Sequence, residues 1–97
     1  MTIKITGVQL GKESFQKDFA SLPDEVKTAF GQKIPTLIEH PSASRLRLHD
    51  LSGFKPKIFK IDVTSSGKMY QATFHLVGSV AVFLRVAIHK EIDRRPI

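Results

Sequence analysis

The stretch "VAVFLRVAIHKEIDRR", from Val80 to Arg95, changes character along its length. Between Val80 and Ile88 every residue except Arg85 is apolar, which is the pattern of a strand buried on both faces. The chain then turns to a histidine and a run of charged residues. This segment therefore predicts a strand inside a sheet, with a cluster of chemically active side chains held at its end.

A hairpin joins this strand to the one before it. The preceding segment, "MYQATFHLV", alternates apolar and polar residues, and the "GS" that follows suits a two-residue turn. In that register Val77 lies opposite Val80, and Thr73 lies opposite Leu84. The register decides which side chains of the last strand face the helices and which face away from them.

This register gives the last strand an apolar strip on the face away from the helices. Polar residues of the neighbouring strands share that face, and only nine residues follow Ile88, too few in our interpretation to cover it. An uncovered apolar strip on a small domain usually marks a partner site. We therefore expect a partner protein to bind the strip, which consists of Val82, Leu84, Val86 and Ile88.

Helical spacing and strand alternation organise the rest of the chain. Pro35 lies inside the second helix, where we expect a kink or a break. The predicted fold is one α+β domain spanning 1–97: an N-terminal strand, a two-helix hairpin, and a three-stranded antiparallel meander that completes one sheet. The pattern predicts a strand in 2–10, helices in 11–23 and 24–41, and a further strand in 57–63.

The positive charge is confined to one half of the chain. Residues 1–41 carry five Lys and five acids, whereas residues 42–97 carry ten Lys or Arg against four acids, which accounts for the whole net charge of +6. A one-sided basic half favours a polyanionic partner, RNA or DNA. The alternative is a basic surface that is simply solvated.

The chain contains no cysteine, which excludes disulfides, thiolate catalysis and zinc–thiolate sites and suits a cytoplasmic protein. The histidines at 49, 75 and 89 do not have the spacing of metal ligands, so we predict no metal and no other cofactor. No segment approaches the roughly 18 apolar residues of a membrane span.

The order of these elements, ending in "LRVAIHKEIDR", resembles the RelE/ParE superfamily of bacterial toxins from toxin–antitoxin systems. "FQKDFASLPDEVKTAFGQKIPTLIEHP" is similar to the family's helix pair, "LRLHDLSGF" to its linker, and "IFKIDVTSSGKMYQATF" to its central strands. The resemblance implies a metal-independent, ribosome-dependent mRNA endoribonuclease that a cognate antitoxin neutralises. Two alternatives stay open: a ParE-like inhibitor of DNA gyrase without nuclease activity, and a catalytically lapsed binding module.

The resemblance also implies a catalytic set. By position, Lys60 matches a lysine of the family's nucleases, Lys90 matches the terminal catalytic cation, and His89 matches a histidine of other branches. Gln71 stands where the family has an arginine, and Asp62 where it has a second lysine. The catalytic residues expected are therefore Lys60, His89, Lys90 and Gln71. In the alternative interpretation, Lys60 and Lys90 form surface ion pairs with Asp62 and Glu91.

Further cations are candidates for phosphate contacts. A pair separated by one residue, Arg45 and Arg47, should face one way if the segment is extended. His49 could approach the site, whereas Arg85, inside the apolar strand, is interpreted as an anchor for a buried carboxylate or carbonyl. The predicted RNA-binding residues are Arg45, Arg47, Lys55, Lys57 and Lys68.

Overall fold

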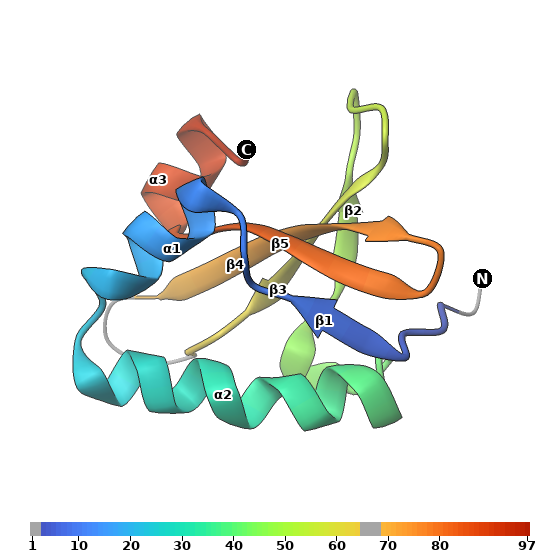
Figure 1. Ribbon diagram of the computed structural model, residues 1–97, viewed down its shortest axis with the longest axis horizontal. Coiled ribbons are helices and arrows are strands. Elements are labelled where there is room, and N and C mark those ends of the chain that lie inside the picture. Colours follow the sequence, from blue (N-terminus) through green and yellow to red (C-terminus); the bar gives the residue numbers. More distant parts are fainter. Residues whose placement is uncertain (1–2, 65–68) are drawn as a thin grey trace.

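The closing strand lies inside a mixed five-stranded sheet with the order β1-β5-β4-β3-β2, in which β1 is parallel to β5 and the other neighbours are antiparallel. The computed structural model describes residues 3–64 and 69–97 (Figure 1). Its elements are β1 (Gly7–Gln9), α1 (Glu13–Ala20), α2 (Asp24–Glu39), the 3-10 helix η1 (Ser44–Leu46), β2 (His49–Leu51), β3 (Ile58–Asp62), β4 (Tyr70–Val77), β5 (Val80–Ile88) and α3 (His89–Arg94).

This arrangement confirms the α+β class, the helix pair and the three-stranded antiparallel meander, and it corrects three details. The first strand is shorter than 2–10, although Ile5 just before it is buried. An additional strand, β2, forms the far edge of the sheet. A third helix, α3, follows β5 directly.

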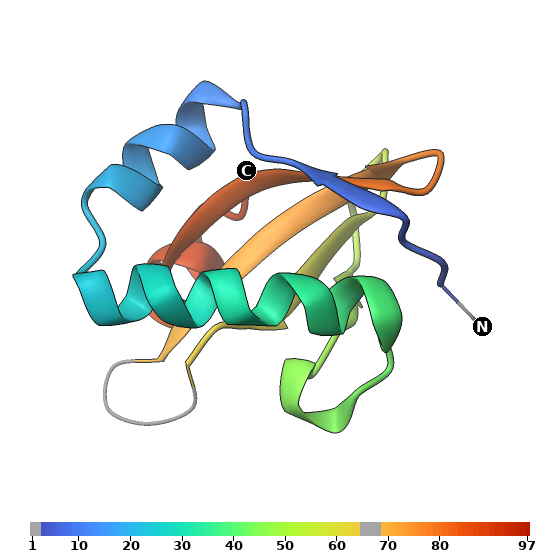
Figure 2. The same ribbon diagram turned by 60° about the horizontal axis from the view of Figure 1, so that its bottom comes forward.

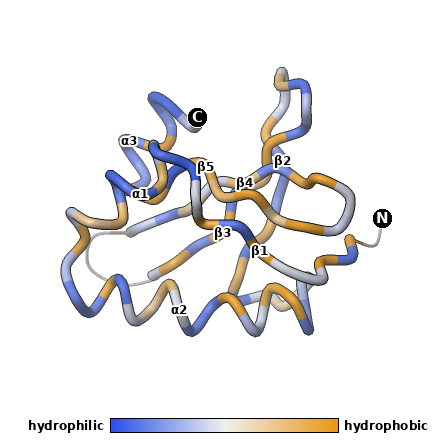
Figure 3. The backbone as a smooth tube through the Cα atoms, viewed as in Figure 1, coloured by the Kyte–Doolittle hydropathy of each residue, from blue (hydrophilic) through white to orange (hydrophobic). Residues whose placement is uncertain are grey.

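The helix α2 lies along one face of the sheet, and α1 packs beside β5 (Figures 1 and 2). Hydrophobic residues recur along α2, whereas α3 is largely hydrophilic (Figure 3). Phenylalanine rings join the helices to the sheet: the Phe30 ring centroid lies 5.3 Å from that of Phe15 and 5.2 Å from that of Phe83. Such aromatic contacts stabilise beyond the area that they bury.

Helix α2 runs continuously from Asp24 to Glu39, so a break at Pro35 is wrong, and a kink there stays a prediction. Proline removes one hydrogen bond and crowds the preceding turn. However, Phe30 before it and Leu37 after it are both buried in the core. This packing on both sides of the proline holds the helix together.

A β-bulge corrects the predicted register of the last hairpin. The pairing is as predicted from Val77 with Val80 to Phe74 with Phe83, and it then shifts, so that Thr73 lies opposite Arg85 instead of Leu84. One extra residue in a strand exchanges the faces of all residues beyond it. Arg85 and Ala87 therefore turn away from α2, whereas the residue between them turns toward it.

The predicted apolar strip of Val82, Leu84, Val86 and Ile88 consequently does not exist as one surface. Val86 lies opposite Ala72 in the core and is 1% exposed. Ile88 lies opposite Tyr70, which packs against that same core. Val82 alone is buried on the other face, opposite His75, and Leu84 is the extra residue at the bulge.

The expectation that too few residues remain to cover the second face is also wrong. We call this second face, opposite α2, the outer face; it carries Lys60, Thr73 and Arg85. The helix α3 folds back over it, and its Ile92 is buried. A single short helix with one apolar anchor is therefore enough to cover part of this face.

The bulge makes a testable prediction about adjacent residues. We expect Val86→Ser to lower the free energy of unfolding by about 2–4 kcal/mol, because it removes buried methyl groups and buries a hydroxyl. Ala87→Ser, one position along and half-buried on the outer face, should cost less than about 1 kcal/mol. Urea unfolding of both variants measures the difference, and a larger loss for Ala87→Ser would mean that the hairpin keeps its register without the bulge.

Candidate functional site

Neighbouring strands set polar residues in a row across the outer face. His49 on β2 lies opposite Lys60 on β3, Lys60 lies opposite Thr73 on β4, and Thr73 lies opposite Arg85 on β5. Residues paired in this way on antiparallel strands point to the same side of the sheet. The row thus brings together one imidazole and two cations that are far apart in the sequence.

Lys60 is the most enclosed lysine for which an ion pair is found in the described chain. Its side chain is only 13% exposed, and its Nζ lies 3.5 Å from Oδ1 of Asp93 on α3. The partner is therefore not Asp62, as the surface-pair interpretation had it. A cation held on a strand and largely shielded from water attracts an anion more strongly than one free in solvent.

Asp62 is buried beside this row and is neutralised by other groups. Gln71 donates from Nε2 to Asp62 Oδ1 at 3.1 Å, and Arg47 Nε lies 3.7 Å from Asp62 Oδ2. A buried carboxylate needs such partners. The predicted catalytic residue Gln71 is thus engaged with Asp62, and its Oε1 is buried without a hydrogen-bond partner among the described residues.

The two predicted residues at the end of β5 belong to α3. His89 is the first residue of this helix and donates its backbone N–H to Met69 O at 2.8 Å. Its Nδ1 is buried and has no hydrogen-bond partner within the part of the chain that is described. Lys90 is exposed, and it lies three residues before Asp93, so both side chains lie on the same side of the helix.

The predicted RNA-binding cations that the structure describes have different surroundings. Arg45 donates to Thr36 Oγ1 at 3.3 Å, whereas Arg47 reaches Asp62, so the expectation that they face one way is wrong. The reason is local: the segment is not extended, since a 3-10 helix ends at a left-handed Arg47 with φ 49°. Lys57 pairs with Asp50 at 3.5 Å, Lys55 is exposed, and Lys68 lies outside the described residues.

His49 is the site residue whose importance the sequence alone understates. Its Nδ1 lies 2.7 Å from the carbonyl oxygen of Arg47. Because a carbonyl can only accept, Nδ1 must donate, and the neutral ring then carries its free lone pair on Nε2. This tautomer leaves an exposed nitrogen that can accept a proton, on the residue paired with Lys60.

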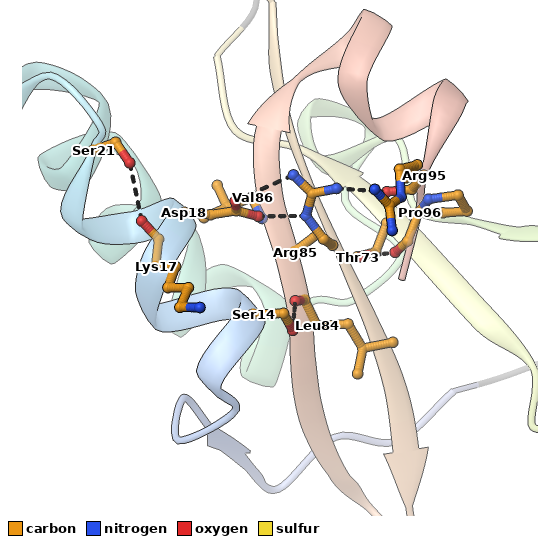
Figure 4. A network of polar contacts seen from close by, with 10 residues as sticks. All are labelled: Ser14, Lys17, Asp18, Ser21, Thr73, Leu84, Arg85, Val86, Arg95 and Pro96. Carbon is orange, nitrogen blue, oxygen red and sulfur yellow. Dashed lines mark hydrogen bonds and ion pairs between the residues drawn. The ribbon is translucent and has the colours of Figure 1, made fainter.

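The hydrogen bonds of Arg85 hold the end of the chain against the outer face (Figure 4). Arg85 donates from Nε to Asp18 Oδ2 at 2.6 Å, from Nη2 to Asp18 Oδ1 at 3.2 Å, and from Nη1 to the Arg95 carbonyl at 2.9 Å. Thr73 donates to the Pro96 carbonyl at 2.6 Å. These contacts confirm that Arg85 anchors a carboxylate and a carbonyl.

The same carboxylate fixes the charge and the backbone of β5. By accepting hydrogen bonds from Arg85, Asp18 raises the pKa of the guanidinium above its ordinary value, so that the cation stays charged. The Val86 N–H also donates to Asp18 Oδ2, at 3.2 Å, and Ser14 donates to the Leu84 carbonyl at 2.7 Å. Side chains of α1 thus provide hydrogen-bond partners for backbone groups of β5 beyond the part of this strand that pairs with β1.

The described residues, 3–64 and 69–97, also bear on the class of site. They contain no group of three or more His, Asp or Glu side chains that could hold a metal ion. None of their helices has both the length and the apolar character that crossing a bilayer requires.

Comparisons with known proteins give one structural likeness. No family model matches the sequence, and no curated protein matches it. Among solved structures, the chain is similar to a copper-bound mutant of a toxin from Helicobacter pylori, with a TM-score of 0.57 and 21% sequence identity over 94% of this chain and 99% of that one. At this identity the likeness shows that the two chains share a fold.

The Asp18 contacts predict a large and specific effect on stability. We expect Asp18→Ala to lower the free energy of unfolding by about 3 kcal/mol, because it leaves a largely buried guanidinium and the Val86 N–H without their acceptor. Glu13→Ala, which removes an exposed ion pair of the same helix, should cost about 0.5 kcal/mol or less. Equal losses in thermal unfolding would contradict this account.

Proposed function

We propose that the protein is the toxin of a toxin–antitoxin pair and acts as a metal-independent, ribosome-dependent endoribonuclease on mRNA. The observation that carries the proposal is the shielded ammonium of Lys60, paired across the strands with His49 and covered by a single carboxylate. The fold shared with a bacterial toxin and the basic second half of the chain support it. We propose that a cognate antitoxin neutralises the protein in the cytoplasm.

The residues around Lys60 suit transfer of a phosphoryl group within RNA. His49 Nε2 takes the proton of the ribose 2′-hydroxyl, and the 2′-oxygen forms a bond to phosphorus as the bond to the 5′-oxygen breaks. Lys60 and Arg47 stabilise the additional negative charge of the five-coordinate phosphate. The 5′-oxygen takes a proton from Lys90, which leaves a 2′,3′-cyclic phosphate and a 5′-hydroxyl.

In this proposal Asp93 occupies the position of a substrate phosphate. Its carboxylate oxygen lies within reach of Lys60 Nζ, and its side chain is 63% exposed. An exposed carboxylate on a short helix competes only weakly, because surface ion pairs contribute little. A phosphate of mRNA positioned by the ribosome would replace the Asp93 carboxylate at Lys60, while α3, which carries Lys90, stays in place.

His89 and Gln71 take different roles from those first expected. The buried Nδ1 of His89 and the hydrogen bond of Gln71 to Asp62 favour a positioning function for both. His89 starts the helix that carries Lys90 and Asp93, and Gln71 holds the carboxylate that Arg47 contacts. Exposed Arg45, Lys55 and Lys57, together with Lys68, are proposed to contact phosphates farther along the RNA.

A second candidate function is inhibition of a protein target such as DNA gyrase, without nuclease activity. The observation that favours this second function is the ion pair of Lys60 with Asp93. Because the carboxylate already neutralises the charge of Lys60, no substrate phosphate is needed to do so. A catalytically lapsed binding module would share this feature. Both alternatives predict that Lys60 contributes to the stability of the protein and not to its activity.

The catalytic proposal predicts the effect of two single substitutions. Lys60→Met and His49→Gln should each lower mRNA cleavage by about 100-fold or more and relieve growth arrest on induction, because each removes charge stabilisation or proton transfer. Lys12→Met, an exposed lysine on α1's N-terminal side, is the control. If the folded Lys60→Met variant arrests growth as fully as the parent, the nuclease proposal fails and the protein-target inhibitor replaces it.

The proposed competition by Asp93 predicts a gain of activity. Asp93→Asn should raise the rate of mRNA cleavage by up to about fivefold, since releasing Lys60 from an ion pair whose carboxylate is exposed removes up to ~1 kcal/mol of competition. Asp50→Asn, which releases the exposed Lys57 instead, should leave the rate unchanged. Cleavage mapping on ribosomes with both variants tests this, and a fall in rate for Asp93→Asn would show that the carboxylate assists the reaction.

A further inference from the structure

A groove runs beside the edge strand β2, at the end of the molecule away from α1 and α3. The N-terminal segment and the end of α2 come together at this end (Figures 1 and 2). The groove has a volume of about 930 Å³, which is within the range of binding sites. Ile3, Ile38, Leu48 and Phe59 give it an apolar floor.

The strand β2 leaves one side of its backbone without a neighbouring strand. It is the last strand of the sheet order and pairs only with β3 among the described elements. An edge strand offers unpaired N–H and C=O groups to an added strand. Because Leu48, His49 and Asp50 also line the groove, a strand added along this edge would direct alternate side chains into it.

The charge around this edge is positive. Residues 40–60 carry five Lys or Arg against the single acid Asp50, a net of +4, and Asp50 is already paired with Lys57. The groove itself is bordered by exposed Lys4, His40 and Arg47, with Glu39 as its other acid. An occupant with acidic residues is therefore complementary to this edge.

We propose that the β2 edge and its groove bind an extended, acidic segment of a partner protein, with apolar residues at alternate positions. The inference rests on the proposed function, because the partner that it describes is the neutralising antitoxin. It moves the docking surface from the outer face of β5, where the predicted strip is interrupted, to the opposite edge of the sheet.

Apart from Arg47 and His49, which the proposed function assigns to the reacting nucleotide, the lining of the groove favours a peptide over RNA. Sequence-tolerant binding of single-stranded RNA uses exposed aromatic faces on which bases stack. Phe59 is the one phenylalanine, tyrosine or tryptophan among the described residues that line the groove, and it is only 6% exposed. The floor instead presents aliphatic side chains beside a free strand edge, which is the arrangement that a peptide strand requires.

A defined peptide tests the inference without ribosomes or RNA. The probe is fluorescein-labelled Asp-Val-Glu-Ile-Asp-Val-Glu, compared with the same peptide carrying lysine at its acidic positions. We expect the acidic peptide to bind with a Kd below 1 mM in an anisotropy titration and to protect the amides of residues 48–51 from hydrogen exchange. The double variant Lys4→Glu with His40→Glu should weaken binding at least tenfold.

Matched variants separate this inference from the proposed function. Lys12→Glu with Gln16→Glu makes the same change of charge on exposed positions away from the groove and should leave binding unchanged. Lys60→Met should abolish RNA cleavage but keep peptide binding. If Lys60→Met keeps full activity while the peptide binds, the nuclease proposal fails and the proposal of peptide binding in the groove is supported.

Three outcomes would overturn the inference. The first is no binding of the acidic peptide up to 1 mM, or binding that the groove variant does not weaken. The second is binding of the acidic peptide without protection of the amides of residues 48–51, which would place the peptide elsewhere on the molecule. The third is a dimer in sedimentation that Lys4→Glu with His40→Glu dissociates, which would assign the edge to a second copy of the chain.

Discussion

The carboxylate of Asp18 is the contact on which the rest of the structure depends. It accepts two hydrogen bonds from Arg85 and one from the backbone of Val86, so it joins α1 to β5 just beyond the β-bulge. With its guanidinium fixed, Arg85 also donates from Nη1 to the Arg95 carbonyl and holds the chain end over the outer face. One acidic side chain of α1 thus binds β5 beyond the bulge and, through Arg85, positions the chain end that lies over the candidate site.

The sequence predicts the elements whose hydrophobic periodicity is strong. Prediction fails where side chains from distant segments determine the local backbone conformation. The meander, the helix pair and the pairing of Phe74 with Phe83 follow from alternation and turn length. The bulge does not, because it is stabilised by Ser14 and Asp18, which lie about 70 residues earlier in the chain. Helix α3 was missed because "HKEIDR" has one apolar residue, and a segment with one apolar residue carries no helical period.

The candidate site likewise contains one residue that the sequence pattern places and two that depend on distant segments. The prediction that Lys60 lies on a strand is confirmed, since its segment alternates clearly and forms β3. Its neighbour His49 depends on the register of β2, a strand of three residues that leaves almost no pattern in the sequence. Its ion-pair partner Asp93 depends on the return of α3 over the sheet. Sequence reasoning therefore predicted a lysine at the candidate site, whereas the pairing of distant segments determines which histidine and which acid lie beside it.

The bonds that hold the chain end have a consequence for how this region can vary among homologues. Arg85 and Thr73 both bind main-chain carbonyl oxygens, those of Arg95 and Pro96. A substitution at either acceptor position keeps its carbonyl, so the side chains there are free to diverge. Gain or loss of one residue between Ile88 and Pro96 would instead rotate α3 by about 100° and carry both carbonyls out of register. Evolution of this segment is therefore constrained in length more than in composition.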